Sequence, residues 1–155
     1  MGLMKITIDT NIFINVKEEE EPYFDYSSRI LDAVEDGQIK GVISIITITE
    51  LCVGYYNINK PKEKDEYISN MYSQNNYIIV NLDRVLADQS AKIRSETNLR
   101  LPDSIIVATT LQEKAFFLIS NDGKFDRAKD FLKVCTSEEF CKKYLNSKRL
   151  NDVNG

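Results

Sequence analysis

The sequence predicts an α/β protein, a three-layer α/β/α sandwich with a central, mostly parallel sheet of four or five strands. Short apolar segments rich in β-branched residues alternate with longer segments in which apolar residues recur at helical spacing. No hairpin signal joins any two predicted strands, which favours a parallel sheet covered by helices on both faces. The chain has 155 residues, 43% of them hydrophobic, so we expect a single domain over residues 1–145 and a flexible C-terminal tail over residues 146–155.

The first half of the chain predicts two strands, each followed by a helix. The first strand is apolar and β-branched and ends at Asp9, with a turn or a helix start after it. Pro22 suits the first turn of the next helix, and Gly37 suits its left-handed end. The predicted elements are strands over residues 4–8 and 40–44 and helices over residues 22–36 and 46–56.

The second half continues the alternation after a polar stretch over residues 59–76. Pro102 and Asp103 mark a helix start, because proline fits a first turn and aspartate fits the positive end of the helix dipole. The sequence SNDG, from Ser120 to Gly123, predicts a turn. The predicted elements are an exposed helix around residues 63–73, strands over 77–80, 116–119 and 133–135, and helices over 82–98, 102–111 and 137–144.

The chain contains no histidine. This excludes a Ser/His/Asp triad, a histidine general base and a zinc site that contains histidine. Any hydrolytic chemistry would therefore use carboxylates and a hard cation, which favours Mg²⁺ or Mn²⁺.

Cysteine count and hydropathy point to a cytoplasmic protein. Cys52, Cys135 and Cys141 are an odd number without CxxC spacing, and they are best read as reduced thiols. No apolar run approaches the roughly 20 residues that span a bilayer, and no signal peptide is recognised, so we expect no membrane association. The formal net charge of −4 argues against nucleic-acid binding through diffuse positive charge alone, although a local site is compatible with it.

Four acidic residues lie where an α/β fold brings chain segments together: Asp9, Glu50, Asp103 and Asp122. Two unit charges about 5 Å apart repel by on the order of 3 kcal/mol at an effective dielectric constant near 20, so such a cluster needs a cation or protons. Each acid also has a purely structural interpretation. Asp9 could cap a helix, Asp103 could complement a helix dipole, Asp122 could form an Asx turn, and Glu50 could be a solvated helix residue. Glu50 weakens the joint structural interpretation, because we expect it to be buried in the segment ITITELCVG.

Four segments in order along the chain carry a resemblance to a known family: ITIDTNIFI, ISIITITEL, LPDSIIVATTL and LISNDGKF. Together they resemble the PIN-domain nucleases, and in size the chain is similar to the VapC-type toxins of VapBC toxin–antitoxin pairs. The resemblance runs from Met4 to about Tyr144. Each segment alone recurs by chance, but four in sequence within strand or helix context are fairly specific. The fold implied is a PIN-like sandwich.

The resemblance implies a Mg²⁺- or Mn²⁺-dependent ribonuclease that hydrolyses RNA with a metal-activated water. It implies a homodimer and a small antitoxin protein that inhibits the toxin. The implied catalytic residues and metal ligands are Asp9, Glu50, Asp103 and Asp122, with Thr10, Asn11 and Ser120 in support and Asp126 as a possible additional acid. Basic residues near these motifs are candidates for phosphate contact: Arg94, Arg100, Lys124 and Arg127.

Two alternatives remain open from the sequence. The first is a catalytically inactive PIN-like interaction module, against which the retention of all four acids counts. The second is a phosphoryl-transfer domain in which Asp9 is the phosphoacceptor at a strand end. The second alternative leaves Glu50 unexplained, and a phosphatase of the haloacid-dehalogenase type would need an acid at position 11, where this chain has Asn11.

Overall fold

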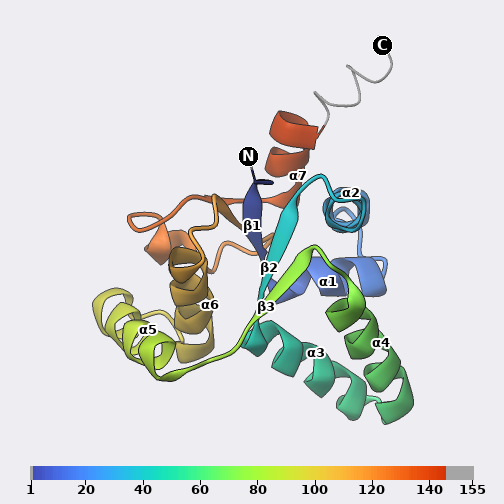
Figure 1. The fold of residues 1–155 in the computed structure, drawn as a ribbon, viewed down its shortest axis with the longest axis horizontal. Helices are drawn as coiled ribbons and strands as arrows, with labels where there is room; N and C mark the ends of the chain where they lie inside the picture. Colours follow the sequence, from blue (N-terminus) through green and yellow to red (C-terminus); the bar gives the residue numbers. More distant parts are fainter. Residues whose placement is uncertain (1, 146–155) are drawn as a thin grey trace.

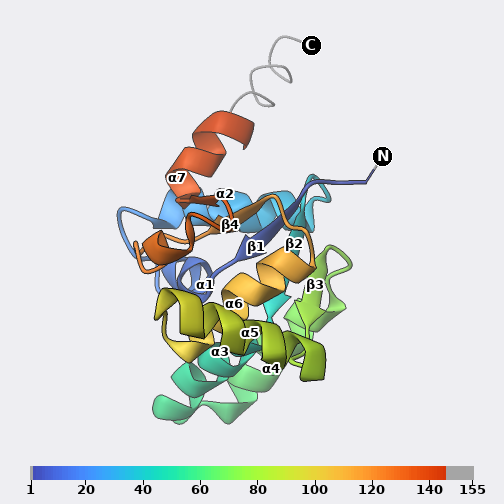
Figure 2. The ribbon, with the colours of Figure 1, turned by 90° about the vertical axis from the view of Figure 1, so that its left-hand side faces the viewer.

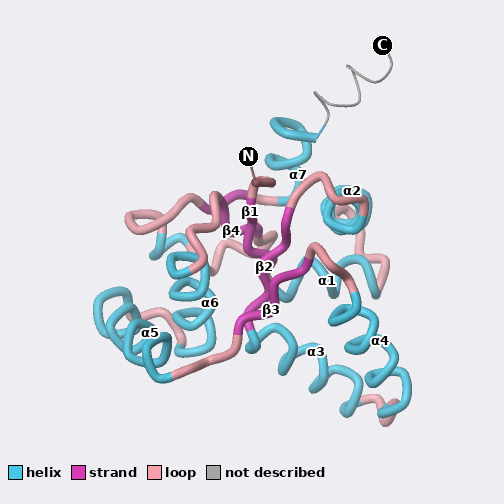
Figure 3. The backbone as a smooth tube through the Cα atoms, in the orientation of Figure 1, coloured by secondary structure: helices cyan, strands magenta, loops and turns pink. Residues whose placement is uncertain are grey.

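The fold is taken from a computed structural model that describes residues 2–145. The predicted tail, residues 146–155, lies outside the described residues. Five parallel strands form one sheet in the order β3-β2-β1-β4-β5, which confirms the predicted parallel sheet (Figure 3). The strands are β1 (Lys5–Ile8), β2 (Lys40–Ser44), β3 (Tyr77–Val80), β4 (Phe117–Ile119) and β5 (Val134–Cys135).

Helices cover both faces of this sheet, which confirms the predicted three-layer sandwich. The helices are α1 (Thr10–Lys17), α2 (Phe24–Glu35), α3 (Ile45–Asn57), α4 (Pro61–Ser73), α5 (Arg84–Thr97), α6 (Leu101–Gln112) and α7 (Ser137–Phe140). Helices α5 and α6 lie on one side of the sheet, and α1, α2, α3 and α4 lie on the other (Figures 1 and 2). No helix within residues 2–145 combines the length and apolar character needed to cross a membrane.

The alternation of side chains along the strands gives the protein two hydrophobic clusters. In β4, Phe117 and Ile119 belong to the cluster beneath α1 and α2, whereas Leu118 belongs to the cluster beneath α5 and α6. Successive strand residues point to opposite faces, so a fully apolar strand such as β4 fills both clusters. This explains why the sequence shows continuous apolar runs rather than an alternating pattern.

The connection order places a topological switch point between β1 and β4. The chain proceeds from β1 to β2 and β3 on one side, then returns to place β4 on the other side of β1. Ile8 and Ile119 are paired in register, and the backbone N–H of Asp9 donates to the carbonyl of Ile119 over 3.0 Å. Ligands of open parallel sheets bind at the carboxyl ends of the strands at such a point. The fold therefore directs attention to Asp9 and to the residues that follow Ile119.

Candidate active site at the carboxyl edge of the sheet

Asp9 is the most buried of the candidate carboxylates, with no exposed surface. Its Oδ2 atom accepts hydrogen bonds of 2.9 Å from the amide of Asn11 and from the hydroxyl of Ser120, and it lies 3.0 Å from Nζ of Lys124. Its Oδ1 atom is buried and has no hydrogen-bond partner among the described residues. A buried carboxylate oxygen without a partner is costly, so this atom marks a place where a proton or a cation would be stabilised.

The ammonium group of Lys124 lies among three of the four candidate carboxylates. Its Nζ atom is 3.0 Å from Asp9 Oδ2, 3.5 Å from Asp103 Oδ1 and 3.8 Å from Asp122 Oδ2. The sequence suggested that Lys124 contacts phosphate, but in this structure its partners are carboxylates. A single positive charge thus brings together the residue that follows β1, a residue of α6 and a residue of the turn after β4.

Burial and charge act in opposite directions on this group of residues. Burial raises the pKa of Asp9, and this effect outweighs the opposing influence of Lys124, Ser120 and the backbone of Thr10. Burial lowers the pKa of Lys124, but Asp9, Asp103 and Asp122 together raise it above its usual value. The lysine is therefore charged at neutral pH, and Asp9 binds protons more readily than an exposed aspartate does.

Asp103 lies in the first turn of α6, where the positive end of the helix dipole favours a carboxylate. Its side chain is 6% exposed, and its Oδ2 atom is 3.5 Å from Nε of Arg100. The side chain of Arg100 is 72% exposed, so it is accessible to a ligand that approaches Asp103 from solvent.

Asp122 stabilises the turn after β4 and also belongs to the carboxylate cluster around Lys124. Its Oδ1 atom accepts the backbone N–H of Lys124 over 3.0 Å, which is the Asx turn that the sequence allows. Its Oδ2 atom faces the ammonium of the same lysine, and the side chain is 51% exposed. The turn fixes the backbone of Lys124 so that the lysine side chain folds back toward Asp9.

Glu50 joins the site through Thr10 rather than through Lys124. The Thr10 hydroxyl lies 2.7 Å from Oε1 of Glu50 and 3.0 Å from the hydroxyl oxygen of Thr47. A hydroxyl has one proton, so Thr10 donates to Glu50 and accepts from Thr47. The sequence predicts a buried Glu50, but the structure shows it partly exposed, because the buried face of α3 is formed by other residues: Thr47, Ile48, Leu51 and Tyr55.

A second polar network, which the sequence did not reveal, anchors the loop after β4. The Asn121 amide donates to Oδ1 of Asn15 over 2.8 Å, and Oδ1 of Asn121 accepts the backbone N–H of Ser137 over 3.0 Å. The backbone N–H of Asn121 in turn donates to Oδ1 of Asn11 over 3.2 Å. These contacts fix the loop against α1 and α7. The sequence SND by itself predicts only a turn. It does not reveal the partners of Asn121, because they are distant in the chain.

Other predicted site residues have partners outside the cluster. Asp126 begins a short 3-10 helix (Asp126–Ala128), is 68% exposed and pairs with Lys129 over 3.0 Å. Arg94 donates to the side chain of Asn98, and Arg127 donates to the carbonyl of Asn98 over 3.3 Å. These two arginines therefore meet at the end of α5.

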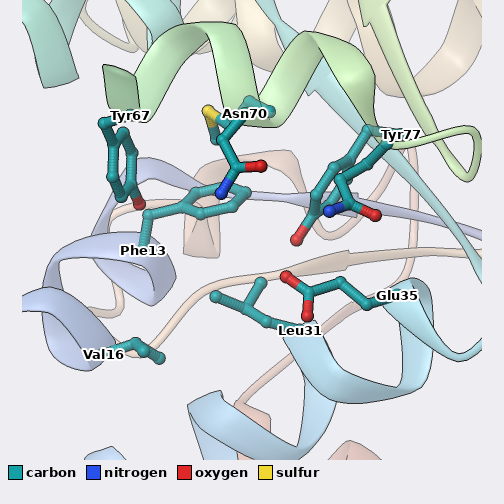
Figure 4. Close-up of a pocket in the computed structure, with 9 residues that line it drawn as sticks. Phe13, Val16, Leu31, Glu35, Tyr67, Asn70 and Tyr77 are labelled. Atoms are coloured by element: carbon teal, nitrogen blue, oxygen red, sulfur yellow. The ribbon is translucent and has the colours of Figure 1, made fainter.

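An apolar pocket of about 170 Å³ lies elsewhere, between α1, α2, α4 and β3. Figure 4 shows Phe13, Tyr67 and Tyr77 around it, with Glu35 at its edge. Its lining shares no residue with the carboxylate cluster. Among the described residues that line it, Glu35 is the only carboxylate, so no group of acids meets there, and we assign the candidate chemistry to the cluster around Asp9.

The donor set at the cluster fits a hard divalent cation. Within residues 2–145 no group of three or more acidic, cysteine or histidine side chains is already arranged to hold an ion. The ligand type is nevertheless suitable, because carboxylate oxygens are what Mg²⁺ and Mn²⁺ prefer. Lys124 and Arg100 supply two positive charges to the four candidate carboxylates, so two negative charges stay uncompensated when all four are ionised. Asp9 Oδ1 supplies an unused ligand atom.

Comparisons with known proteins agree with this architecture. The family model described as "PIN domain" matches residues 6–130. A chain of a toxin–antitoxin complex from Klebsiella pneumoniae is 26% identical, with a TM-score of 0.64, and the match covers 85% of this chain and 97% of that one. A chain of VapBC2 from Rickettsia felis, bound to a promoter DNA fragment, is 19% identical, with a TM-score of 0.67 and coverages of 86% and 98%. VapC20 from Mycobacterium tuberculosis, described as a toxin that cleaves the sarcin-ricin loop, is 12% identical, with a TM-score of 0.64 and coverages of 79% and 94%. A search among curated proteins finds no significant match.

Proposed function

Because the chain belongs to the PIN domain family, we propose that it is a ribonuclease that depends on Mg²⁺ or Mn²⁺ and is the toxin of a toxin–antitoxin pair. The observation that carries the proposal is the unpartnered, buried Oδ1 atom of Asp9 at the switch point of the sheet. This oxygen lies in a cluster where Asp103 and Asp122 converge on one cationic group.

In this proposal, Asp9, Asp103, Asp122 and Glu50 would hold the divalent ion. Bound there, Mg²⁺ or Mn²⁺ would supply an activated water and would neutralise charge on the phosphate. Asn11 and Ser120 orient Asp9 by donating hydrogen bonds to Oδ2, which leaves Oδ1 available. Thr10 orients Glu50 in the same way. Arg100, exposed beside Asp103, is placed to contact a substrate phosphate.

The proposed partners are an RNA substrate, a small antitoxin protein and a second copy of the chain. The likeness to chains from toxin–antitoxin complexes supports the antitoxin. The likeness to VapC20, which is described as cleaving the sarcin-ricin loop, supports RNA as the substrate class. The homodimer rests on the family resemblance. An RNA substrate would place the protein in the cytoplasm.

One observation favours the inactive interaction module as a second candidate. Lys124 already gives Asp9 and Asp103 a positive partner, so the carboxylates can be kept together without a divalent ion. In that case the acids would serve the fold, and the protein would act by binding alone. The two candidates differ in a single measurable property, the cleavage of RNA.

The proposal is tested with purified protein and a mixture of end-labelled structured and single-stranded RNAs. We expect cleavage in Mg²⁺ or Mn²⁺, no cleavage in EDTA, and loss of cleavage in Asp9→Asn. Circular dichroism of the variant checks that it is folded. Intact RNA under every ion condition, with a folded protein, would leave the interaction module as the better description.

A further inference from the structure

We propose that Lys124 is the built-in cation of the acidic site: it holds the carboxylates together in the metal-free protein and lowers the affinity of the site for a divalent ion. The inference rests on the proposed function, because it concerns the ion that the ribonuclease would bind. It identifies a residue that sets ion affinity and that supplies no ligand atom.

The position of the ammonium is the first argument. Nζ of Lys124 contacts one oxygen each of Asp9, Asp103 and Asp122, at 3.0, 3.5 and 3.8 Å. These carboxylates come from three separate segments of the chain, so the lysine takes the central position that a metal ion takes among its ligands. An ordinary ion pair joins only two side chains.

Burial makes the contact between Lys124 and Asp9 important for stability. The Asp9 side chain has no exposed surface, and the Lys124 side chain is 27% exposed. Exposed ion pairs are weakened by solvent and salt, whereas a buried charge that loses its partner is strongly destabilised. Removing the ammonium would therefore leave the buried Asp9 carboxylate without its positive partner, which should destabilise the metal-free protein.

The backbone shows that this lysine is held in place. Asp122 accepts the backbone N–H of Lys124 over 3.0 Å, and the next residue, Phe125, is 1% exposed and belongs to the cluster beneath α5 and α6. The start of the lysine side chain is thus fixed between a turn and the hydrophobic core. Arg100 provides a contrast, because it is 72% exposed and contacts only Asp103 among the site carboxylates.

The same contacts predict competition with an added cation. A divalent ion that binds Asp9 and Asp103 comes close to the ammonium, and like charges within a few ångströms repel. Either the lysine side chain moves out or the ion binds more weakly. In both cases the loss of the lysine charge strengthens ion binding, while the metal-free protein becomes less stable.

The test uses Lys124→Met and Lys124→Gln, with Lys129→Met as the matched control. Lys129 also pairs with one aspartate, Asp126, but its side chain is 60% exposed and it has no contact with the site carboxylates among the pairs described. Isothermal titration measures the Kd for Mn²⁺, and thermal unfolding in EDTA measures the metal-free stability. We expect both Lys124 variants to bind Mn²⁺ at least about tenfold more tightly than the wild type while their Tm in EDTA falls. The control should change neither quantity.

The inference predicts that Mn²⁺ affinity rises while the Tm in EDTA falls. General damage to the fold would instead lower both. Mn²⁺ binding by the variants together with no detectable binding by the wild type would also support the inference. Equal or weaker Mn²⁺ binding in both Lys124 variants would overturn it, and so would the absence of binding in all proteins. RNA cleavage is scored separately. Ion-dependent cleavage with unchanged ion affinity rejects only the role of Lys124, whereas tighter ion binding without any cleavage rejects only the ribonuclease.

Discussion

The side chains of Asn11 and Ser120, which are 109 residues apart in the sequence, meet at Asp9. The Asn11 amide donates to the Ser120 hydroxyl oxygen over 2.9 Å, and each of the two side chains donates to Oδ2 of Asp9 over 2.9 Å. The amide has two protons and the hydroxyl has one, so every donor in this triangle has an acceptor. The arrangement fixes the orientation of a buried carboxylate before any ligand arrives.

Replacement of Ser120 should therefore destabilise the protein. Ser120→Ala removes one hydrogen bond to Asp9 and leaves the Asn11 amide with one acceptor fewer, which should lower the free energy of unfolding by about 1–3 kcal/mol. Urea denaturation in EDTA measures the change. Ser73→Ala is the control, since its exposed hydroxyl bonds only to the carbonyl of Asn70, and it should stay within about 0.5 kcal/mol of the wild type. Equal stability of both variants would refute the buried triangle.

A substitution of Thr10 tests whether its hydroxyl orients Glu50 for activity. Thr10→Val keeps the shape of the side chain and removes the donor to Oε1 of Glu50. Outer hydrogen-bond partners of metal ligands typically contribute 10–100-fold to activity or ion affinity, so we expect kcat/KM for RNA to fall by about tenfold or more. Thr10→Ser retains the donor and should retain most of the activity. A valine variant as active as the wild type would show that Glu50 needs no fixed orientation.

We expect Asp126 to take no part in catalysis. Its side chain is 68% exposed and pairs with Lys129, and surface pairs of this kind contribute little. Cleavage of RNA by Asp126→Asn should thus stay within about twofold of the wild type. A loss comparable to that of Asp9→Asn would add Asp126 to the site.

The thiol of Cys135 should be unreactive in the folded protein. Burial raises the pKa of Cys135 from 9.0 to about 12, with Glu139 and Cys141 acting in the same direction and Lys143 opposing them. The folded thiol stays protonated at pH 8.5, and alkylation by iodoacetamide should be much slower than in urea, as mass spectrometry of the Cys135 peptide would show. The unfolded thiol ionises first as the pH rises. Cys135 therefore contributes stability below about pH 9 that is lost progressively between about pH 9 and pH 12. Labelling at the same rate in both states would contradict the assignment.

The fold followed from the sequence because its signals are local. Apolar, β-branched runs marked the strands, and the proline at position 102 marked the start of α6 within one residue. The sequence left the residues after Asp9 as a turn or a helix start, and the structure shows the helix α1 there. The predicted strand over residues 116–119 begins one residue later in the structure: Phe116 is 54% exposed and lies just before β4, although its backbone N–H donates to the carbonyl of Lys5.

The details of the site depended on contacts that the sequence does not encode locally. The position of Lys124 beside an acidic motif makes it a candidate for phosphate contact, but only the structure shows that the turn at Asp122 directs its side chain toward Asp9. Glu50 was expected to be buried from the apolar character of its segment, yet helical geometry leaves it partly exposed. The partners of Asn121 come from α1 and α7, at sequence separations that no motif spans.

The central claim is that the carboxylates around Lys124 cleave RNA with the help of a divalent ion. The most direct test compares the single-turnover cleavage rates of the wild type and Asp103→Asn on one RNA at saturating Mn²⁺, with both proteins shown to be folded. The substitution preserves the shape of the side chain and removes the charge that faces Lys124 and Arg100. We predict a rate loss of at least about 100-fold, as expected when a group that stabilises transition-state charge is removed. Equal rates for the two proteins would contradict the account.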